Sequence, residues 1–339
     1  MGRRYTAAVL RIERGGRLQF ERAYGRLAAG PGEPQTEVTT RFDLASLTKL
    51  FTAAAALELA DAGAIALDDS LVRWFPEWRS TPHAAVTLRM LLAHTSGMQS
   101  GADYRALLGR DVERFARELP LVSEPAERVL YSDIGFIVLG TLIGRISAMS
   151  LARSVENLCR KTGAEATAFR PRNDDPRVFP ATEADEWRGR VRGSVHDEKA
   201  HLMGGVAGHA GLFGTAYDVA RLTDAFLAPR SGRRAPLLSG ARALEATSEQ
   251  GADPVLRRGL GWALKTSDEN SCGAAMDRTT FGHTGFTGTS VWADPVRDLS
   301  VVFLTNAVYF GRLDLRDVRA AVCDAAVREA PRLRSGQAG

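Results

Sequence analysis

Ser46 and Lys49 stand three residues apart in the segment SLTK, within a stretch rich in alanine and leucine. If this stretch is helical, the two side chains lie on the same side of one turn. A serine hydroxyl becomes a good nucleophile only when a neighbouring group removes its proton. A lysine can be that base if its pKa is lowered, and burial and a helix N-terminus both favour that shift. The spacing therefore predicts acyl transfer with Ser46 as nucleophile and Lys49 as base.

Two further segments carry groups that suit the same chemistry. Tyr131 begins the segment YSD, which ends at Asp133 and precedes an apolar stretch typical of a helix. His283, Thr284 and Gly285 form the segment HTG in a β-prone region near the C-terminus.

The order of SLTK, YSD and HTG, with the phrases FDLASLTK, LLAHTSG and GHTGFTG, resembles the serine β-lactamase and penicillin-binding-protein superfamily. The resemblance is strongest to the branch of class C β-lactamases, D-alanyl-D-alanine peptidases and family VIII esterases, and it covers nearly the whole chain. It implies that Ser46 is acylated and that Lys49 deprotonates it. It also implies that Tyr131 passes the proton to the leaving group.

The same resemblance implies a binding wall and an oxyanion hole. The strand that carries His283, Thr284 and Gly285 would form one wall of the cleft. The backbone N–H groups of Ser46 and Phe286 would face the developing oxyanion, and losing one such donor typically costs roughly 3–4 kcal/mol of barrier.

Two residues depart from the pattern of the superfamily. His283 replaces the lysine of the third motif, so we expect carboxylate recognition there to be weaker or dependent on pH. Asp133 replaces an asparagine that binds the amide of the substrate, and an ionised aspartate can only accept hydrogen bonds. The sequence leaves open whether Asp197 and His209, in segments resembling a subgroup of these hydrolases, contact the substrate or stabilise loops.

The elements that position these residues follow from periodicity and turn signals. Two β-prone runs, 5–12 and 17–24, flank Gly15-Gly16, and several more lie near the C-terminus. Between them, the stretch around Ser46 predicts a buried helix of about four turns that ends at Gly63. We therefore expect an α/β fold with one antiparallel sheet built from both termini and flanked by helices. Residues 1–66 and 200–339 would form this α/β domain, and 67–199 a mostly helical insertion.

Composition excludes several other classes of protein. The 339 residues carry a net charge of +4 with no basic stripe, which argues against nucleic-acid binding. The three cysteines lack CxxC spacing and the six histidines lack HxH or HxxxH spacing, so we expect neither a metal nor a cofactor. The N-terminus resembles a strand and no apolar run approaches the roughly 20 residues that span a bilayer. We therefore expect a cytoplasmic protein that binds no membrane.

The sequence thus favours a serine hydrolase that cleaves a small-molecule ester or amide through an acyl-serine intermediate. A transacylase that passes the acyl group to an amine or alcohol is the first alternative, because the two activities differ only in deacylation. A β-lactamase or D,D-peptidase, or a sensor module that is acylated without turnover, is a further alternative. Nothing in the sequence indicates an oligomeric state.

Overall fold

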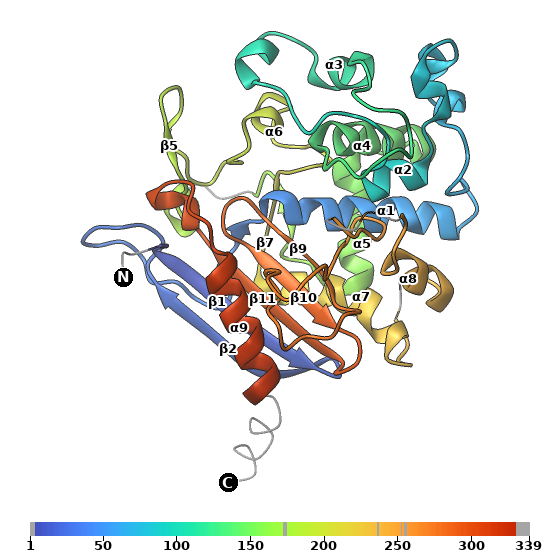
Figure 1. The fold of residues 1–339 in the computed structure, drawn as a ribbon. Helices are drawn as coiled ribbons and strands as arrows, with labels where there is room; N and C mark the ends of the chain where they lie inside the picture. Colours follow the sequence, from blue (N-terminus) through green and yellow to red (C-terminus); the bar gives the residue numbers. More distant parts are fainter. Residues whose placement is uncertain (1–3, 172–174, 236, 252, 254–255, 330–339) are drawn as a thin grey trace.

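The structure, a computed structural model, describes residues 4–171, 175–235, 237–251, 253 and 256–329. Its main feature is a six-stranded sheet with the strand order β2-β1-β11-β10-β9-β8. The strands of this sheet are β1 Ala7–Arg14, β2 Arg17–Gly25, β8 Ala263–Leu264, β9 Phe281–Thr284, β10 Ser290–Asp294 and β11 Leu299–Thr305. All neighbouring pairs are antiparallel, and β1 pairs with β11. The predicted sheet from both termini is confirmed (Figure 1).

The two faces of this sheet are covered by different helices. Along β11, Val301 packs in a cluster with Cys323 of α9 (Arg316–Glu329), whereas Val302 belongs to the larger core that contains Leu222 of α7 (Ala216–Arg230). Successive side chains of a strand point to opposite faces. Because both faces are buried, β11 contains the consecutive apolar residues Val301, Val302, Phe303 and Leu304 in place of an apolar–polar alternation.

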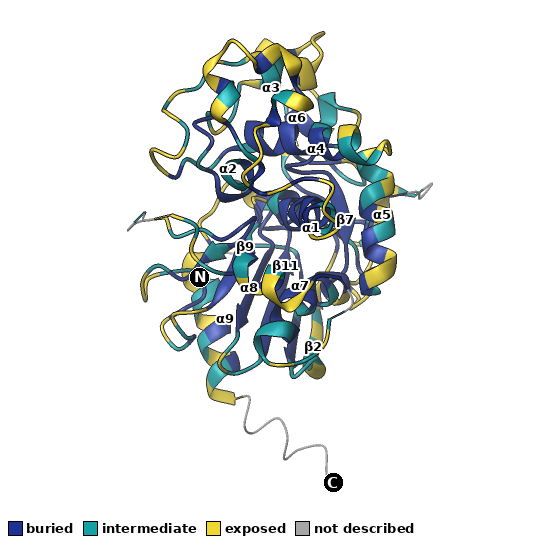
Figure 2. Cartoon of the chain, turned by 90° about the vertical axis from the view of Figure 1, so that its right-hand side faces the viewer, coloured by how far each residue is buried: buried dark blue, intermediate teal, exposed yellow. Residues whose placement is uncertain are grey.

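The remaining helices form a second layer beside the sheet, with α1 near the middle of the molecule (Figure 2). These helices are α1 Thr48–Asp61, α2 Leu88–Ala93, α3 Val112–Glu118, α4 Asp133–Ser147, α5 Leu151–Thr162 and α6 Glu198–Leu202, whereas α8 Gly240–Ala246 packs against α7. Helix α1 packs against α4 and α5 and is buried on nearly every side. Its small alanine side chains allow this close packing. The predicted helix ends as expected, with Gly63 at φ 75° just beyond it.

The described chain also contains short strands outside the six-stranded sheet. A three-stranded sheet has the order β3-β7-β4, and β5 pairs with β6 in a hairpin. These strands are β3 Phe42–Asp43, β4 Ala168–Phe169, β5 Ala184–Asp185, β6 Gly189–Arg190 and β7 Leu212–Gly214. The segment 67–199 therefore contains strands as well as helices, and its separation as a domain stays a prediction.

No single helix in the described part of the chain is both long and apolar enough to cross a bilayer. Helices α4 and α5 reach the necessary length and hydropathy only when taken together, and the chain bends by 82° at the break between them.

Candidate active site

Ser46 lies in a short turn of 3₁₀ helix, Ala45–Leu47, that leads directly into α1. Ala45 adopts φ 47°, a left-handed conformation that is unfavourable for a residue with a side chain. The carboxylate of Asp43 stabilises this turn, because its Oδ1 accepts the Ala45 N–H at 2.8 Å. Backbone strain of this kind is typical of functional sites, where the surrounding structure holds it in place.

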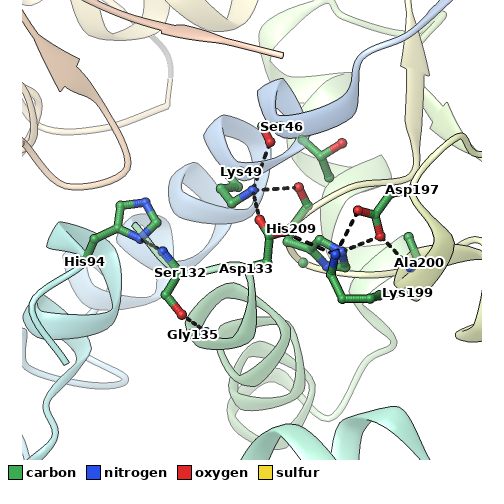
Figure 3. Close-up of polar contacts among 12 residues, drawn as sticks. Ser46, Lys49, His94, Ser132, Asp133, Gly135, Asp197, Lys199, Ala200 and His209 are labelled. Carbon is green, nitrogen blue, oxygen red and sulfur yellow. Dashed lines mark hydrogen bonds and ion pairs between the residues drawn. The ribbon is translucent and has the colours of Figure 1, made fainter. Parts of the chain in front are cut away.

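Lys49 lies in the first turn of α1 and has no exposed surface. Its Nζ is 3.1 Å from Ser46 Oγ, 3.1 Å from the His209 carbonyl oxygen and 2.8 Å from Asp133 Oδ1 (Figure 3). An ammonium has three N–H donors. The three acceptors around Nζ therefore suit a protonated lysine.

The expectation of a lowered pKa for Lys49 is wrong. Burial does favour the neutral form, but the carboxylate of Asp133 and the hydroxyl of Tyr131 outweigh it and raise the pKa of Lys49 above its ordinary value. Burial would likewise raise the pKa of Asp133, yet Lys49 and other nearby cations hold it below its ordinary value. The expectation rested on burial and the helix terminus, and it did not include the charge of Asp133, which lies two residues after Tyr131. Lys49 and Asp133 are thus an ion pair at rest.

Tyr131 lies between several cationic and aromatic groups. Lys49 Nζ is 4.8 Å from the centroid of its ring, and Arg258 Cζ is 5.3 Å from it. His94 packs against the same ring at 4.6 Å, and its Nδ1 accepts the N–H of Ser132 at 3.0 Å. His94 therefore fixes the backbone next to Tyr131.

His283 and Thr284 lie on β9, the strand that faces Ser46 across the cleft. His283 Nδ1 is 2.8 Å from the Thr284 carbonyl oxygen, so this nitrogen carries the proton. Burial, with the nearby charges of Arg258 and Lys49, lowers the pKa of His283 to about 3. His283 is consequently uncharged at neutral pH and cannot replace the lysine of the third motif as a cation.

The turn after β9 is tied to the backbone before Ser46. Thr287 Oγ1 donates to the Asp43 carbonyl at 2.8 Å, and Thr289 Oγ1 donates to the Leu44 carbonyl at 3.0 Å. Gly285 permits this approach, since a Cβ there would lie 2.0 Å from Thr289 Oγ1. Within the described part of the chain, the N–H of Phe286 in this turn has no hydrogen-bond partner. The structure is compatible with the predicted oxyanion role of Phe286, which stays a prediction.

Ser46, Tyr131, His283 and Thr284 all line one cavity of about 850 Å³. Arg258 lines the same cavity and was not predicted from the sequence. Among the described residues, neither Nε nor Nη1 of Arg258 has a hydrogen-bond partner, although both atoms are buried. Burial lowers the pKa of this guanidinium, and Tyr131 and Asp253 offset only part of the effect.

Asp197 and His209 lie on the other side of Lys49, and the Asp197 carboxylate contacts both the His209 ring and the Lys199 ammonium (Figure 3). His209 Nε2 is 2.8 Å from Asp197 Oδ1. Among the described residues, Asp133, Asp197 and His209 are the one group whose atoms lie close enough to hold a metal ion. The ammonium groups of Lys49 and Lys199 already pair with its carboxylates, which disfavours a further cation.

Sequence reasoning missed Arg258 and Lys199 for different reasons. Arg258 follows another arginine in a chain rich in arginine, so no pattern distinguishes it. Lys199 did offer a signal, because it is one of only four lysines in the chain and follows Asp197 by two residues.

The fold and this site together define a protein of the β-lactamase and transpeptidase type: an antiparallel sheet with helices, and a serine and lysine on a central helix. The chain belongs to the Beta-lactamase family, whose profile matches residues 1–325. Members of this family are serine hydrolases or acyltransferases.

Individual relatives support this assignment. A protein of Escherichia coli (strain K12), named as a proposed D-alanyl-D-alanine carboxypeptidase, is 30% identical over 346 residues, with 89% of this chain and 78% of the relative covered. The structure is similar to that of EstCE1, a hydrolase with promiscuous acyltransferase activity, with a TM-score of 0.75, 23% identity and coverage of 96% and 94%. It is also similar to a variant of simvastatin synthase from Aspergillus terreus, with a TM-score of 0.74, 20% identity and coverage of 97% and 92%.

Proposed function

We propose that this protein is a serine hydrolase that cleaves an ester or amide of a small molecule through an acyl-enzyme at Ser46, and that the leaving group carries a carboxylate. The observation that carries the proposal is the shared cavity of Ser46 and Arg258. The first residue supplies the nucleophile and the second supplies an anion-binding group.

The charges around the cavity favour an anionic substrate. Lys49 is already paired with Asp133, and His283 is uncharged at neutral pH. The guanidinium of Arg258 has buried N–H groups without partners. Leaving such donors unsatisfied is costly, and a carboxylate can accept from two of them at once. A substrate carboxylate would therefore complete the site.

The reaction follows from the contacts of Ser46. In the minor fraction of molecules whose Lys49 is unprotonated, the Ser46 proton passes to Lys49 while Oγ bonds the acyl carbon. Tyr131 gives its proton to the leaving group as the bond to that group breaks and takes up the proton that Lys49 received, so both side chains return to their starting states. Water then releases the acyl group. The E. coli relative is named for the removal of a C-terminal residue, and such a leaving group carries the carboxylate that Arg258 would bind.

A matched pair of thioesters tests this proposal. Benzoylglycyl-thioglycolate ends in a carboxylate, and its methyl ester has the same thioester without the charge. Arg258→Met should lower kcat/KM for the acid roughly 10- to 100-fold, the size expected for a lost hydrogen bond to a charged group, and change the methyl ester far less. Equal losses for both compounds would show that Arg258 does not recognise the carboxylate.

Acyl transfer to an amine or alcohol is a second candidate. The cavity of about 850 Å³ leaves room for an acceptor beside an acyl group, since pockets of roughly 300–1,000 Å³ hold ligands of drug size. Adding amines during turnover of the thioester separates the two activities. Amide in large excess over free acid would identify a transacylase, whereas free acid alone would identify a hydrolase.

A further inference from the structure

Five residues form a closed ring of polar contacts next to Ser46, which we call the lysine–carboxylate ring (Figure 3). Asp133 contacts Lys49 at 2.8 Å through Oδ1 and Lys199 at 3.4 Å through Oδ2. Lys199 continues to Asp197 Oδ2 at 3.1 Å, and Asp197 Oδ1 meets His209 Nε2 at 2.8 Å. The His209 carbonyl oxygen closes the ring at Lys49, 3.1 Å away.

Lys199 occupies a fixed place between the two carboxylates. It is buried in the first turn of α6. Asp197 is the N-cap of the same helix, and its Oδ1 accepts the Ala200 N–H at 2.8 Å. One carboxylate therefore both begins α6 and holds the lysine that this helix presents to Asp133.

We propose that Lys199 is a positioning residue of the acylation step, which occupies the second oxygen of Asp133 and so limits the hold of that carboxylate on Lys49. The inference rests on the proposed function, because it concerns the proton that Lys49 takes from Ser46. It assigns to Lys199 a role that neither the motifs nor the relatives indicate.

The physical reason is the sharing of one negative charge by two cations. A carboxylate paired with a single buried ammonium stabilises the charged lysine strongly, because the surroundings screen the pair poorly. A lysine that stays protonated cannot accept the Ser46 proton. The positive charge of Lys199 opposes the charge on Lys49, and it draws on the same carboxylate. Lys49 therefore releases its proton at a lower pH than it would beside Asp133 alone.

Other charged or titratable groups also face Lys49. Tyr131 precedes α4 and Asp133 is its first residue. Asp197 and His209 belong to the lysine–carboxylate ring. His94 directly follows α2, His283 lies on β9, and Arg258 lies in the segment before β8. Burial keeps the pKa values of His94 and His283 well below the ordinary value, so neither gains a charge at neutral or alkaline pH.

The test measures how fast Ser46 reacts with a fluorophosphonate probe between pH 6 and pH 10, followed as the mass of the intact protein. This readout needs no knowledge of the natural substrate. Lys199→Met removes the charge and keeps much of the volume. Lys199→Arg retains the charge, and Lys161→Met removes an exposed lysine of α5 that pairs with Glu58. Thermal unfolding of each variant reports on folding.

We expect Lys199→Met to move the acid limb of the labelling rate upward by roughly 0.5–1 pH unit, so that labelling at pH 7 slows about three- to tenfold. Because the pKa of Lys49 is raised, the acid limb extends over the whole range of the assay, and the slowing should be similar at each pH within it. Lys199→Arg should restore the position of the limb, and Lys161→Met should leave the whole profile unchanged.

Three outcomes are distinguishable. An unmoved limb in Lys199→Met, or a loss that Lys199→Arg does not restore, would overturn the role of Lys199 while leaving the nucleophile intact. If Lys199→Met does not fold, Lys199→Gln provides the same comparison, and an unmoved limb there would likewise overturn the proposal. Absence of labelling at Ser46 in the wild type would instead contradict the proposed function itself.

Discussion

Lys49 Nζ lies 2.8 Å from Asp133 Oδ1, and this ion pair sits directly beside the nucleophile, because the same Nζ is 3.1 Å from Ser46 Oγ. Lys49 has no exposed surface. The carboxylate therefore determines the protonation state of the residue that must accept the Ser46 proton. In the superfamily that the sequence resembles, an asparagine stands in place of Asp133 and carries no such charge.

Replacing Asp133 with asparagine should change the pH dependence of acylation. The carboxylate raises the pKa of Lys49 against the effect of burial, so in Asp133→Asn only Tyr131 would still oppose burial and that pKa would fall. The acid limb of the labelling rate should move to lower pH by about 1–3 units, the usual effect of one close opposite charge. Labelling at pH 6 would then be faster than in the wild type. A limb that moves upward would contradict this account of the pair.

Removing the amine of Lys49 should abolish most of the activity. Lys49→Ala should lose roughly 10²-fold or more of the acylation rate, in line with general-base contributions. Lys49→Arg should lose nearly as much, because arginine stays protonated at any working pH. Single-turnover kinetics with benzoylglycyl-thioglycolate measure both variants, with thermal unfolding as a control for folding. High activity in Lys49→Arg would mean that the residue acts only as a fixed charge.

His283 should contribute to acid sensitivity of the fold. Its pKa is about 3 in the folded protein, and an unfolded histidine has a pKa near 6.5, so the unfolded state binds more protons between these values. The contribution to stability is fully present above pH 6.5 and is lost as the pH falls towards 3. His283→Asn should show a smaller fall in Tm across this window than the wild type. An identical fall in both proteins would indicate that His283 is already protonated when folded.

The sequence predicted the sheet and the contact between Ser46 and Lys49 well because both depend on local patterns. The β-prone runs at 5–12 and 17–24 correspond to β1 and β2, and the alanine-rich stretch corresponds to α1. A serine and a lysine three residues apart in a helix must lie together whatever the rest of the chain does.

The rest of the site depends on contacts between distant segments. Asp133 is 84 positions from Lys49 in the sequence, and its effect on the lysine pKa appears only when α4 packs against α1. Arg258 reaches the cavity through a turn that precedes β8. No local pattern encodes either approach. The predicted direction for the pKa of Lys49 was therefore wrong, and Arg258 was not predicted at all.

Removal of metal ions should leave the activity unchanged. Asp133, Asp197 and His209 lie close together, but two ammonium groups already balance the carboxylates. Exhaustive dialysis against EDTA should therefore preserve the rate of thioester hydrolysis. A loss of activity that added zinc restores would require a metal-dependent mechanism in place of the one proposed.

The central claim is that Ser46 becomes acylated, and mass spectrometry tests it most directly. After exposure to a fluorophosphonate probe, the wild-type protein should gain the mass of one adduct, and peptide mapping should place that adduct on Ser46. Ser46→Ala should gain no mass and hydrolyse no thioester. An adduct on another residue, or full hydrolysis by Ser46→Ala, would contradict the account.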